Sequence, residues 1–217
     1  MLGLSIPQTI AISILPLLFA IVLHEVAHGW VAKLLGDPTA KMMGRLTLNP
    51  IKHIDPIGTL LVPLLLLMLG GFIFGWAKPV PVTWENLKKP KRDMALVAVA
   101  GPAANLIMAL CWALVAKIGL SLGADMAWLA TPLALMGIVG VTFNLILMVL
   151  NLLPILPLDG GRIVESLLPG RLSYTFAKLE PYGFMVLLVL LVSGLLTSVL
   201  GAPVQFFEQV IFKVFNL

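Results

Sequence analysis

The chain has 217 residues, of which 60% are hydrophobic and only 11% are charged, and its mean hydropathy is +1.06. Soluble domains are about 45–50% apolar and about 25% charged, so these values exclude an ordinary water-soluble protein and favour the bilayer as solvent. The net charge of +4 comes from basic residues in a few connecting stretches, which excludes the contiguous basic face of a nucleic-acid-binding protein. The single cysteine, Cys111, excludes an intrachain disulfide and a cysteine-rich metal site.

Long apolar segments follow one another along the chain, each near the roughly 20 residues that a helix needs to cross the hydrocarbon core. They cover residues 6–32, 56–76, 94–118, 127–153 and 183–202. No Lys or Arg precedes the first segment, which leads directly into His24 and Glu25, so we interpret it as a retained span. With neither an internal repeat nor a flexible linker, the sequence predicts one all-α polytopic membrane domain over 1–217, with about four to five transmembrane helices.

The charges of the loops predict the orientation of these segments. The basic loops cover residues 33–53, 78–92 and 162–178. We expect all of them on the cytoplasmic side. Because the loops before and after 56–76 are both basic, we predict that this segment is re-entrant, dipping into the membrane and returning. An ordinary span that breaks the charge rule is the alternative.

Two further stretches carry a local pattern. Residues 78–84 contain Pro79 and Pro81, which favours a short extended edge strand because neither proline can donate to a ladder. Such an edge would pair with an unwound peptide by strand addition, and an interfacial loop is the alternative. The tail over 203–217 has apolar residues at helical spacing, which predicts an amphipathic helix in the interface or packed against the domain.

The first apolar segment ends in the sequence His24-Glu25-Val26-Ala27-His28. On a helix, positions i and i+4 share a face, so His24 and His28 can bind one metal ion while Glu25 reaches a water molecule on it. This pattern is typical of zinc sites with two histidine ligands and a glutamate base. Three ionisable groups at the end of an apolar helix are costly in a bilayer, which argues against the alternative of packing histidines.

Catalytic zinc usually has three protein ligands and a water, so one ligand is missing from this pattern. Asp159 is the candidate, because the apolar segments contain almost no other carboxylate and it follows the fourth segment closely. The two prolines of the stretch 151–162 interrupt the helix, and Gly160-Gly161 permit a tight bend that can aim the carboxylate inward. The predicted orientation puts Asp159 at the same membrane face as His28.

The chain resembles the site-2 protease family of intramembrane metalloproteases. The resemblance rests on the His-Glu-x-x-His at 24–28, the Gly-Pro-Ala-Ala-Asn at 101–105, and the stretch 151–160 with its Leu-Asp-Gly, in this order. It covers roughly residues 20–165 and is greatest with the compact prokaryotic members, since we see no PDZ-like region and no cystathionine-synthase-type tail. The segment 56–76 departs from the simplest core of the family.

The resemblance implies a zinc metalloprotease that hydrolyses peptide bonds in or near the transmembrane segments of membrane proteins, with one Zn²⁺ per chain. It implies that His24, His28 and Asp159 bind the zinc and that Glu25 is the catalytic glutamate. Asn151 matches a family asparagine close to the catalytic centre, where it would hold substrate backbone or an oxyanion; an interhelical hydrogen bond is the alternative.

We expect a catalytic core over about 6–170, followed by a C-terminal span and amphipathic tail over 183–217. The expected location is the cell membrane, with the active site toward the cytoplasm and without a nucleic-acid partner. We assign Gly101 and Asn105 to close helix packing with a polar tie. His53 and Asp55 are interpreted as structural, with a helix cap before Pro56, and a pair supporting the metal site is the alternative.

Two other functions use similar residues. A metal transporter also places buried His and Asp along its ion path, but it needs no glutamate between two histidine ligands and usually shows inverted repeats. An inactive scaffold that binds membrane helices has no need of Glu25. The sequence indicates neither the substrate nor the oligomeric state.

Overall fold

The computed structural model describes residues 4–62 and 78–217, and these residues are overwhelmingly helical. In chain order the helices are α1 (Ile6–Leu34), α2 (Thr39–Met42), α4 (Pro90–Ser121), α5 (Ala127–Asn151), α6 (Asp159–Leu167), α7 (Gly170–Ala177), α8 (Glu180–Val192) and α9 (Leu195–Phe215). The short 3₁₀ or π turns are η1 (Pro50–His53), η2 (Pro56–Leu61), η3 (Trp84–Asn86) and η4 (Ala124–Met126).

The long helices are membrane spans by length and composition. Within the described ranges, α1, α4, α5 and α9 are long and apolar enough to cross a bilayer, and α7 with α8 would form a fifth span bent by 59°. The prediction of an all-α polytopic protein with four to five spans is therefore confirmed. The chain is a multi-pass membrane protein.

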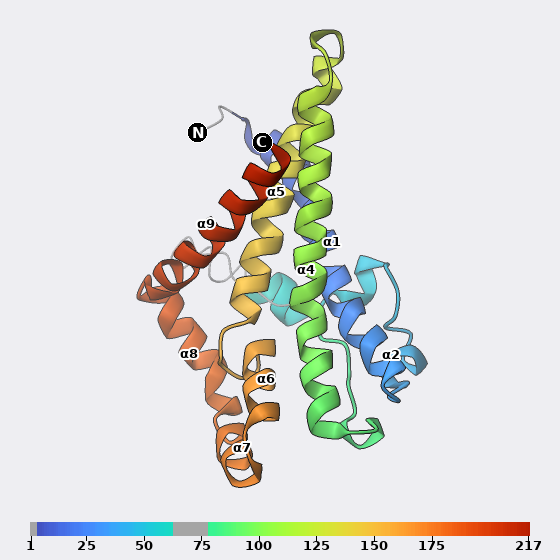
Figure 1. Ribbon diagram of the computed structural model, residues 1–217, viewed down its shortest axis with the longest axis vertical. Helices are drawn as coiled ribbons and strands as arrows, with labels where there is room; N and C mark the ends of the chain where they lie inside the picture. The colour runs from blue at the N-terminus through green and yellow to red at the C-terminus, as the bar shows by residue number, and fades with distance from the viewer. Residues whose placement is uncertain (1–3, 63–77) are drawn as a thin grey trace.

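The core of the molecule lies between α4 and α5, which pack very closely through small residues (Figure 1). A side chain on Gly137 of α5 would stand 2.6 Å from the Cα of Ala116, and one on Gly140 would stand 2.5 Å from Cδ2 of Trp112 and closer still to its Cγ. Small residues let helices approach closely, and the resulting van der Waals contacts help to drive helix association in a bilayer, where apolar burial gives little driving force.

Figure 1 shows α4 running the length of the molecule beside α5, with α6, α7 and the start of α4 at its lower end. The described residues on either side of 63–77 also lie in this lower half. The basic loops 33–53 and 78–92 were both predicted on one side of the membrane, and this placement is consistent with that. The predicted re-entrant segment 56–76 falls mostly on residues 63–77, outside the described ranges.

The stretch 78–84 differs from the predicted edge strand. Residues 78–83 belong to no helix or strand, and η3 begins at Trp84. The N–H groups of Lys78, Val80 and Thr83 donate to the carbonyl of His53 and to the carboxylates of Glu25 and Asp37, respectively. A strand needs a neighbouring strand, and the described part of the chain contains none; the donors of this stretch are used by other groups instead.

The C-terminal part is divided differently from the predicted span 183–202 and tail 203–217. Helix α8 ends at Val192, and Gly194 adopts a left-handed φ of 76°, which glycine tolerates at little cost. Helix α9 then passes straight through the predicted boundary. Its buried residues Val204 and Ile211 belong to the core cluster of α4 and α5, so the tail is part of one packed helix.

Asp55 has the structural role predicted for it. Its carboxylate accepts hydrogen bonds from the backbone N–H groups of Ile57 (2.9 Å) and Gly58 (2.8 Å), and so caps η2. His53 is buried, and its Nε2 lies 2.9 Å from the carbonyl oxygen of Thr47.

Candidate metal centre

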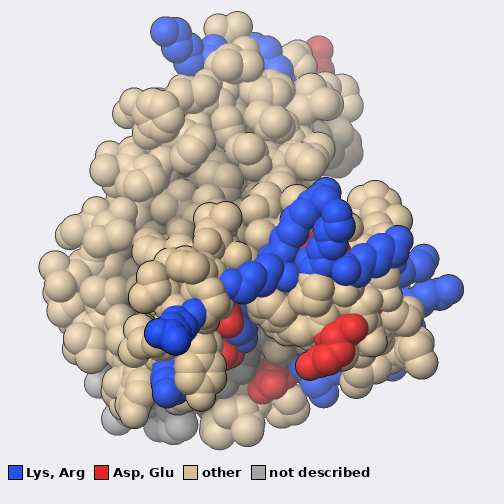
Figure 2. Space-filling view, turned by 60° about the horizontal axis from the view of Figure 1, so that its bottom comes forward, with Lys and Arg blue, Asp and Glu red and all other residues tan. Residues whose placement is uncertain are grey.

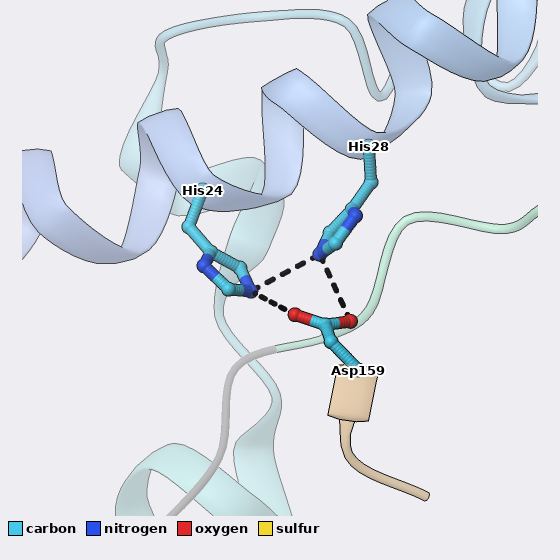
Figure 3. Close-up of side chains that lie close together, drawn as sticks. All are labelled: His24, His28 and Asp159. Carbon is cyan, nitrogen blue, oxygen red and sulfur yellow. Dashed lines mark hydrogen bonds and ion pairs between the residues drawn. The ribbon is translucent and has the colours of Figure 1, made fainter. Parts of the chain in front are cut away.

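His24, His28 and Asp159 meet at one point, as Figure 3 shows. The Nε2 atoms of the two histidines are 3.1 Å apart. The carboxylate of Asp159 lies 3.2 Å from His24 Nε2 and 3.3 Å from His28 Nε2. The structure therefore brings together the three residues predicted as ligands, and their nitrogen and oxygen atoms lie within 4.8 Å of one another.

Local structure places each of these side chains. His24 and His28 are one turn apart on α1, so their rings share a face and meet edge to face, with centroids 4.6 Å apart. Asp159 is the first residue of α6, where the chain turns back on itself. A side chain on Gly160 would collide with the backbone of the preceding turn, and one on Gly161 would stand 2.5 Å from the backbone N of Leu156. The turn lies at 152–158, just before the predicted Gly160-Gly161, which are helical residues of α6 and let it pack closely against that turn.

Gly101 of α4 supplies the space that the two imidazoles occupy. A Cβ at this position would stand 2.6 Å from Cε1 of both His24 and His28, and closer still to His28 Nε2. The close packing predicted for Gly101 is present, but the neighbours are the histidine rings rather than another helix backbone. The sequence held no signal for this, because the contact depends on how α1 crosses α4.

Hydrogen bonds behind the rings determine which nitrogen carries the proton. His28 Nδ1 lies 2.7 Å from the carbonyl oxygen of Val97, which can only accept, so Nδ1 donates and, when the ring is neutral, Nε2 keeps its lone pair. His24 Nδ1 lies 2.6 Å from Oδ1 of Asn105, which also accepts. In the neutral rings, both Nε2 atoms therefore present lone pairs to the carboxylate of Asp159.

When both rings are neutral, this arrangement is a set of acceptors without a donor. Asp159 Oδ2 is buried and has no hydrogen-bond partner in the described structure. Two imidazole nitrogens and a carboxylate that face one another at about hydrogen-bond distance repel unless a cation lies among them. Two His and one carboxylate are a ligand set that zinc takes in catalytic sites, so the residues present fit a zinc ion.

Glu25 lies next to this cluster and is held by the backbone of the stretch 78–83. Its Oε2 accepts a hydrogen bond of 2.8 Å from the N–H of Val80. Val80 is buried against α1, where a side chain on Gly29 would stand 2.8 Å from its Cγ1. The close fit of Val80 on α1 thus fixes the donor that orients the glutamate.

Asp37, which the sequence analysis did not single out, anchors the same stretch. It is fully buried, and its carboxylate accepts from Thr83 N (2.7 Å), Thr39 N (3.0 Å), the Thr39 hydroxyl and Asn86 Nδ2 (2.9 Å). Burial alone would raise its pKa, but these hydrogen bonds hold the pKa of Asp37 below its usual value. An aspartate in a Gly-Asp-Pro turn is too common a pattern to predict this role.

Asn151 ends α5, and its amide donates to the carbonyl of Leu147 within the same helix at 3.0 Å. In the described ranges, no hydrogen bond joins it to the three clustered residues. Its role in catalysis stays a prediction.

Comparison with known proteins gives consistent matches. The model of peptidase family M50 matches residues 12–127 and 117–194. A relative from Bacillus subtilis named "Putative zinc metalloprotease YwhC" is 41% identical over 204 residues, which are 94% of this chain and 90% of the relative. Relatives named "Putative zinc metalloprotease Rip2" are 33% identical in Mycolicibacterium smegmatis (81% of this chain, 64% of the relative) and 30% identical in Mycobacterium tuberculosis H37Rv (92% and 71%). No solved structure matches the chain.

Proposed function

Because this chain belongs to peptidase family M50, the site-2 protease family, and is an intramembrane zinc metalloprotease, we propose that His24, His28 and Asp159 hold its zinc and that Glu25 is its catalytic base. The observation that carries the proposal is the convergence of two Nε2 lone pairs and a carboxylate on one point. Neither the transporter nor the scaffold alternative is favoured by any of the matches.

When bound, zinc would polarise the scissile carbonyl and bring the pKa of a water to about 7. The chain supplies the proton chemistry. Glu25 takes the proton of the attacking water and later delivers it to the leaving nitrogen. The N–H of Val80 holds Oε2 of Glu25 by a charge-assisted hydrogen bond, which keeps the carboxylate oriented during both transfers.

Asn151 is proposed to act on the substrate, either on its backbone or on the developing oxyanion. Its position at the end of α5, a short turn before Asp159, supports a role close to the zinc. Replacement of Asn151 by Ala is expected to lower kcat of cleavage without changing the zinc content. If both kcat and KM stay at the wild-type values, Asn151 serves only its own helix.

The substrates are proposed to be membrane proteins cut in or near a transmembrane helix. A helix hides its peptide bonds within its own hydrogen bonds, so a substrate must unwind before attack. Segments with helix-weakening residues near the cytoplasmic face are therefore expected to be cut fastest. Unchanged cleavage of a segment stiffened by Leu substitutions would contradict this selection.

The active site is proposed to face the cytoplasm, in the cell membrane. Figure 2 shows Lys and Arg side chains gathered over the end of the molecule that carries α2, α7 and the start of α4, with a smaller group at the opposite end. This excess of basic residues is typical of cytoplasmic loops and supports the orientation.

A single domain over 1–217 is proposed, with a catalytic core over about 6–170. The packing of α9 on α4 and α5 supports the inclusion of the C-terminal region 183–217 in the same unit.

A cleavage assay in liposomes tests the assignment of the base. The purified chain is reconstituted with a labelled transmembrane substrate, and Glu25→Gln is compared with wild type. Glu85→Gln, which changes an exposed glutamate of η3, is the matched control. We expect cleavage by wild type and Glu85→Gln and none by Glu25→Gln; cleavage by Glu25→Gln at the wild-type rate would refute the assignment.

A further inference from the structure

Behind His24, two buried asparagines form a hydrogen-bonded chain that crosses from α5 to α1. Asn105 of α4 and Asn144 of α5 have no exposed surface. The amide nitrogen of Asn105 donates to Oδ1 of Asn144 at 3.0 Å and to the carbonyl of Ala20 at 3.1 Å. The amide nitrogen of Asn144 donates to the carbonyl of Gly140 at 2.8 Å.

Backbone carbonyls determine which way both amides face. A carbonyl oxygen only accepts, so the NH₂ group of Asn144 must face Gly140, and its Oδ1 must face Asn105. The NH₂ group of Asn105 then has two acceptors, Oδ1 of Asn144 and the carbonyl of Ala20. Its own Oδ1 is therefore turned to His24.

The orientation of Asn105 selects the tautomer of His24. Because Oδ1 of Asn105 accepts, His24 Nδ1 must carry a proton, so the neutral ring keeps on Nε2 the lone pair that faces Asp159. A reversed amide would present NH₂ to Nδ1 and select the tautomer with its proton on Nε2. That tautomer cannot bind a cation at Nε2.

Asn144 itself contacts none of the three clustered residues through the hydrogen bonds that it makes. A fully buried amide in a membrane helix is costly unless it is hydrogen-bonded, and its bonds lead to the amide that orients His24. A polar tie between α4 and α5 alone would not require a continuous path of fixed direction from Gly140 to the imidazole.

We propose that Asn144 is a positioning residue for metal binding, which fixes the amide of Asn105 and through it the tautomer of His24. The proposal rests on the metal centre proposed above. Zinc binding by the wild-type chain tests that centre. Only variants of Asn144 test the relay, by which we mean the hydrogen-bonded path from Asn144 through Asn105 to His24.

The test measures zinc affinity of the full-length chain in detergent by competition with a chromophoric chelator. Asn144→Leu removes the acceptor and is expected to weaken zinc binding about 10-fold or more, as for other changes behind a ligand histidine. Asn144→Asp, neutral when buried, still offers a carbonyl to Asn105 and a hydroxyl to Gly140, and is expected to bind zinc as wild type does.

The matched control is Thr142→Val, which lies on the same helix. It removes another polar tie of α5, since the Thr142 hydroxyl donates to Glu208 of α9 at 2.5 Å. It lies outside the relay, so zinc affinity is expected to stay at the wild-type value even where thermal stability falls.

A second readout follows the tautomer directly. The chain has three histidines, so ¹⁵N spectra of histidine-labelled, zinc-loaded protein resolve whether Nδ1 or Nε2 of His24 carries the proton. We expect Nδ1–H in wild type and Asn144→Asp, and a shift toward Nε2–H in Asn144→Leu. Wild-type affinity and tautomer in Asn144→Leu would overturn the proposal. If that variant does not fold, loss of zinc by folded Asn144→Asp would overturn it, and wild-type binding would support it.

Discussion

Replacement of Gly101 by Ala is predicted to remove the zinc while leaving the fold intact. The added Cβ would stand 2.6 Å from Cε1 of both His24 and His28, whereas ordinary contacts begin near 3.4 Å. The rings must therefore move by about 0.8 Å. His28 cannot turn away freely, because its Nδ1 is bound to the carbonyl of Val97 at 2.7 Å.

The expected effect on affinity follows from the geometry of zinc. Zinc–nitrogen distances vary by only about 0.2 Å around their usual value, so a displacement of 0.8 Å is not tolerated. We expect zinc affinity to fall by at least about 100-fold, the upper end of the effect of changes around metal ligands. Cleavage should fall in parallel with zinc occupancy.

Zinc content by mass spectrometry of the purified chain, together with its thermal unfolding in detergent, measures this outcome. Gly201→Ala in α9 is the matched control, because a Cβ there meets nothing within 4 Å. The control is expected to keep its zinc. A Gly101→Ala variant that keeps full zinc and full activity would refute the steric argument.

Three further predictions concern the parts around the centre. Gly183→Ala in α8 would set a Cβ 2.6 Å from the carbonyl carbon of Leu156, so it should displace the turn before Asp159 and weaken zinc binding; wild-type affinity would show that α8 does not hold that turn. Asp37→Asn should destabilise the fold by about 1–3 kcal/mol at neutral pH, since a buried acceptor becomes a donor facing donors. Because the folded-state pKa of Asp37 is lowered, its contribution is complete above about pH 4 and is lost as the pH falls through the folded pKa, so the difference in Tm between wild type and variant should shrink below about pH 4. A constant difference would contradict this role. Removal of zinc by a chelator should abolish cleavage, and added zinc should restore it; activity that survives complete removal would contradict zinc catalysis.

The features that could be predicted from sequence are those with a local or energetic signature. The spacing of His24 and His28 determines one face of a helix, whatever that helix packs against. Asp159 could be identified because a carboxylate beside an apolar segment is rare and costly. The two prolines before it predicted the interruption of the helix, and Gly160-Gly161 allow α6 to pack closely against that turn. The spans followed from length and hydropathy alone.

The features that were missed depend on how helices cross. Gly101 touches the imidazoles, and Asn144 reaches His24 through Asn105, only because α1, α4 and α5 pack against one another. The edge-strand prediction for 78–84 failed because other groups take its N–H donors, Val80 pairing with Glu25 and Thr83 with Asp37. No pattern along the chain carries such contacts between distant residues.

The most direct test of the central claim is the zinc content per chain of detergent-purified wild type, Asp159→Ala and Glu25→Gln. We predict about one zinc in wild type, loss of zinc in Asp159→Ala, and retention in Glu25→Gln, which would identify Asp159 as a ligand and free Glu25 for proton transfer. Full zinc in Asp159→Ala, or no zinc in wild type, would contradict the proposed centre.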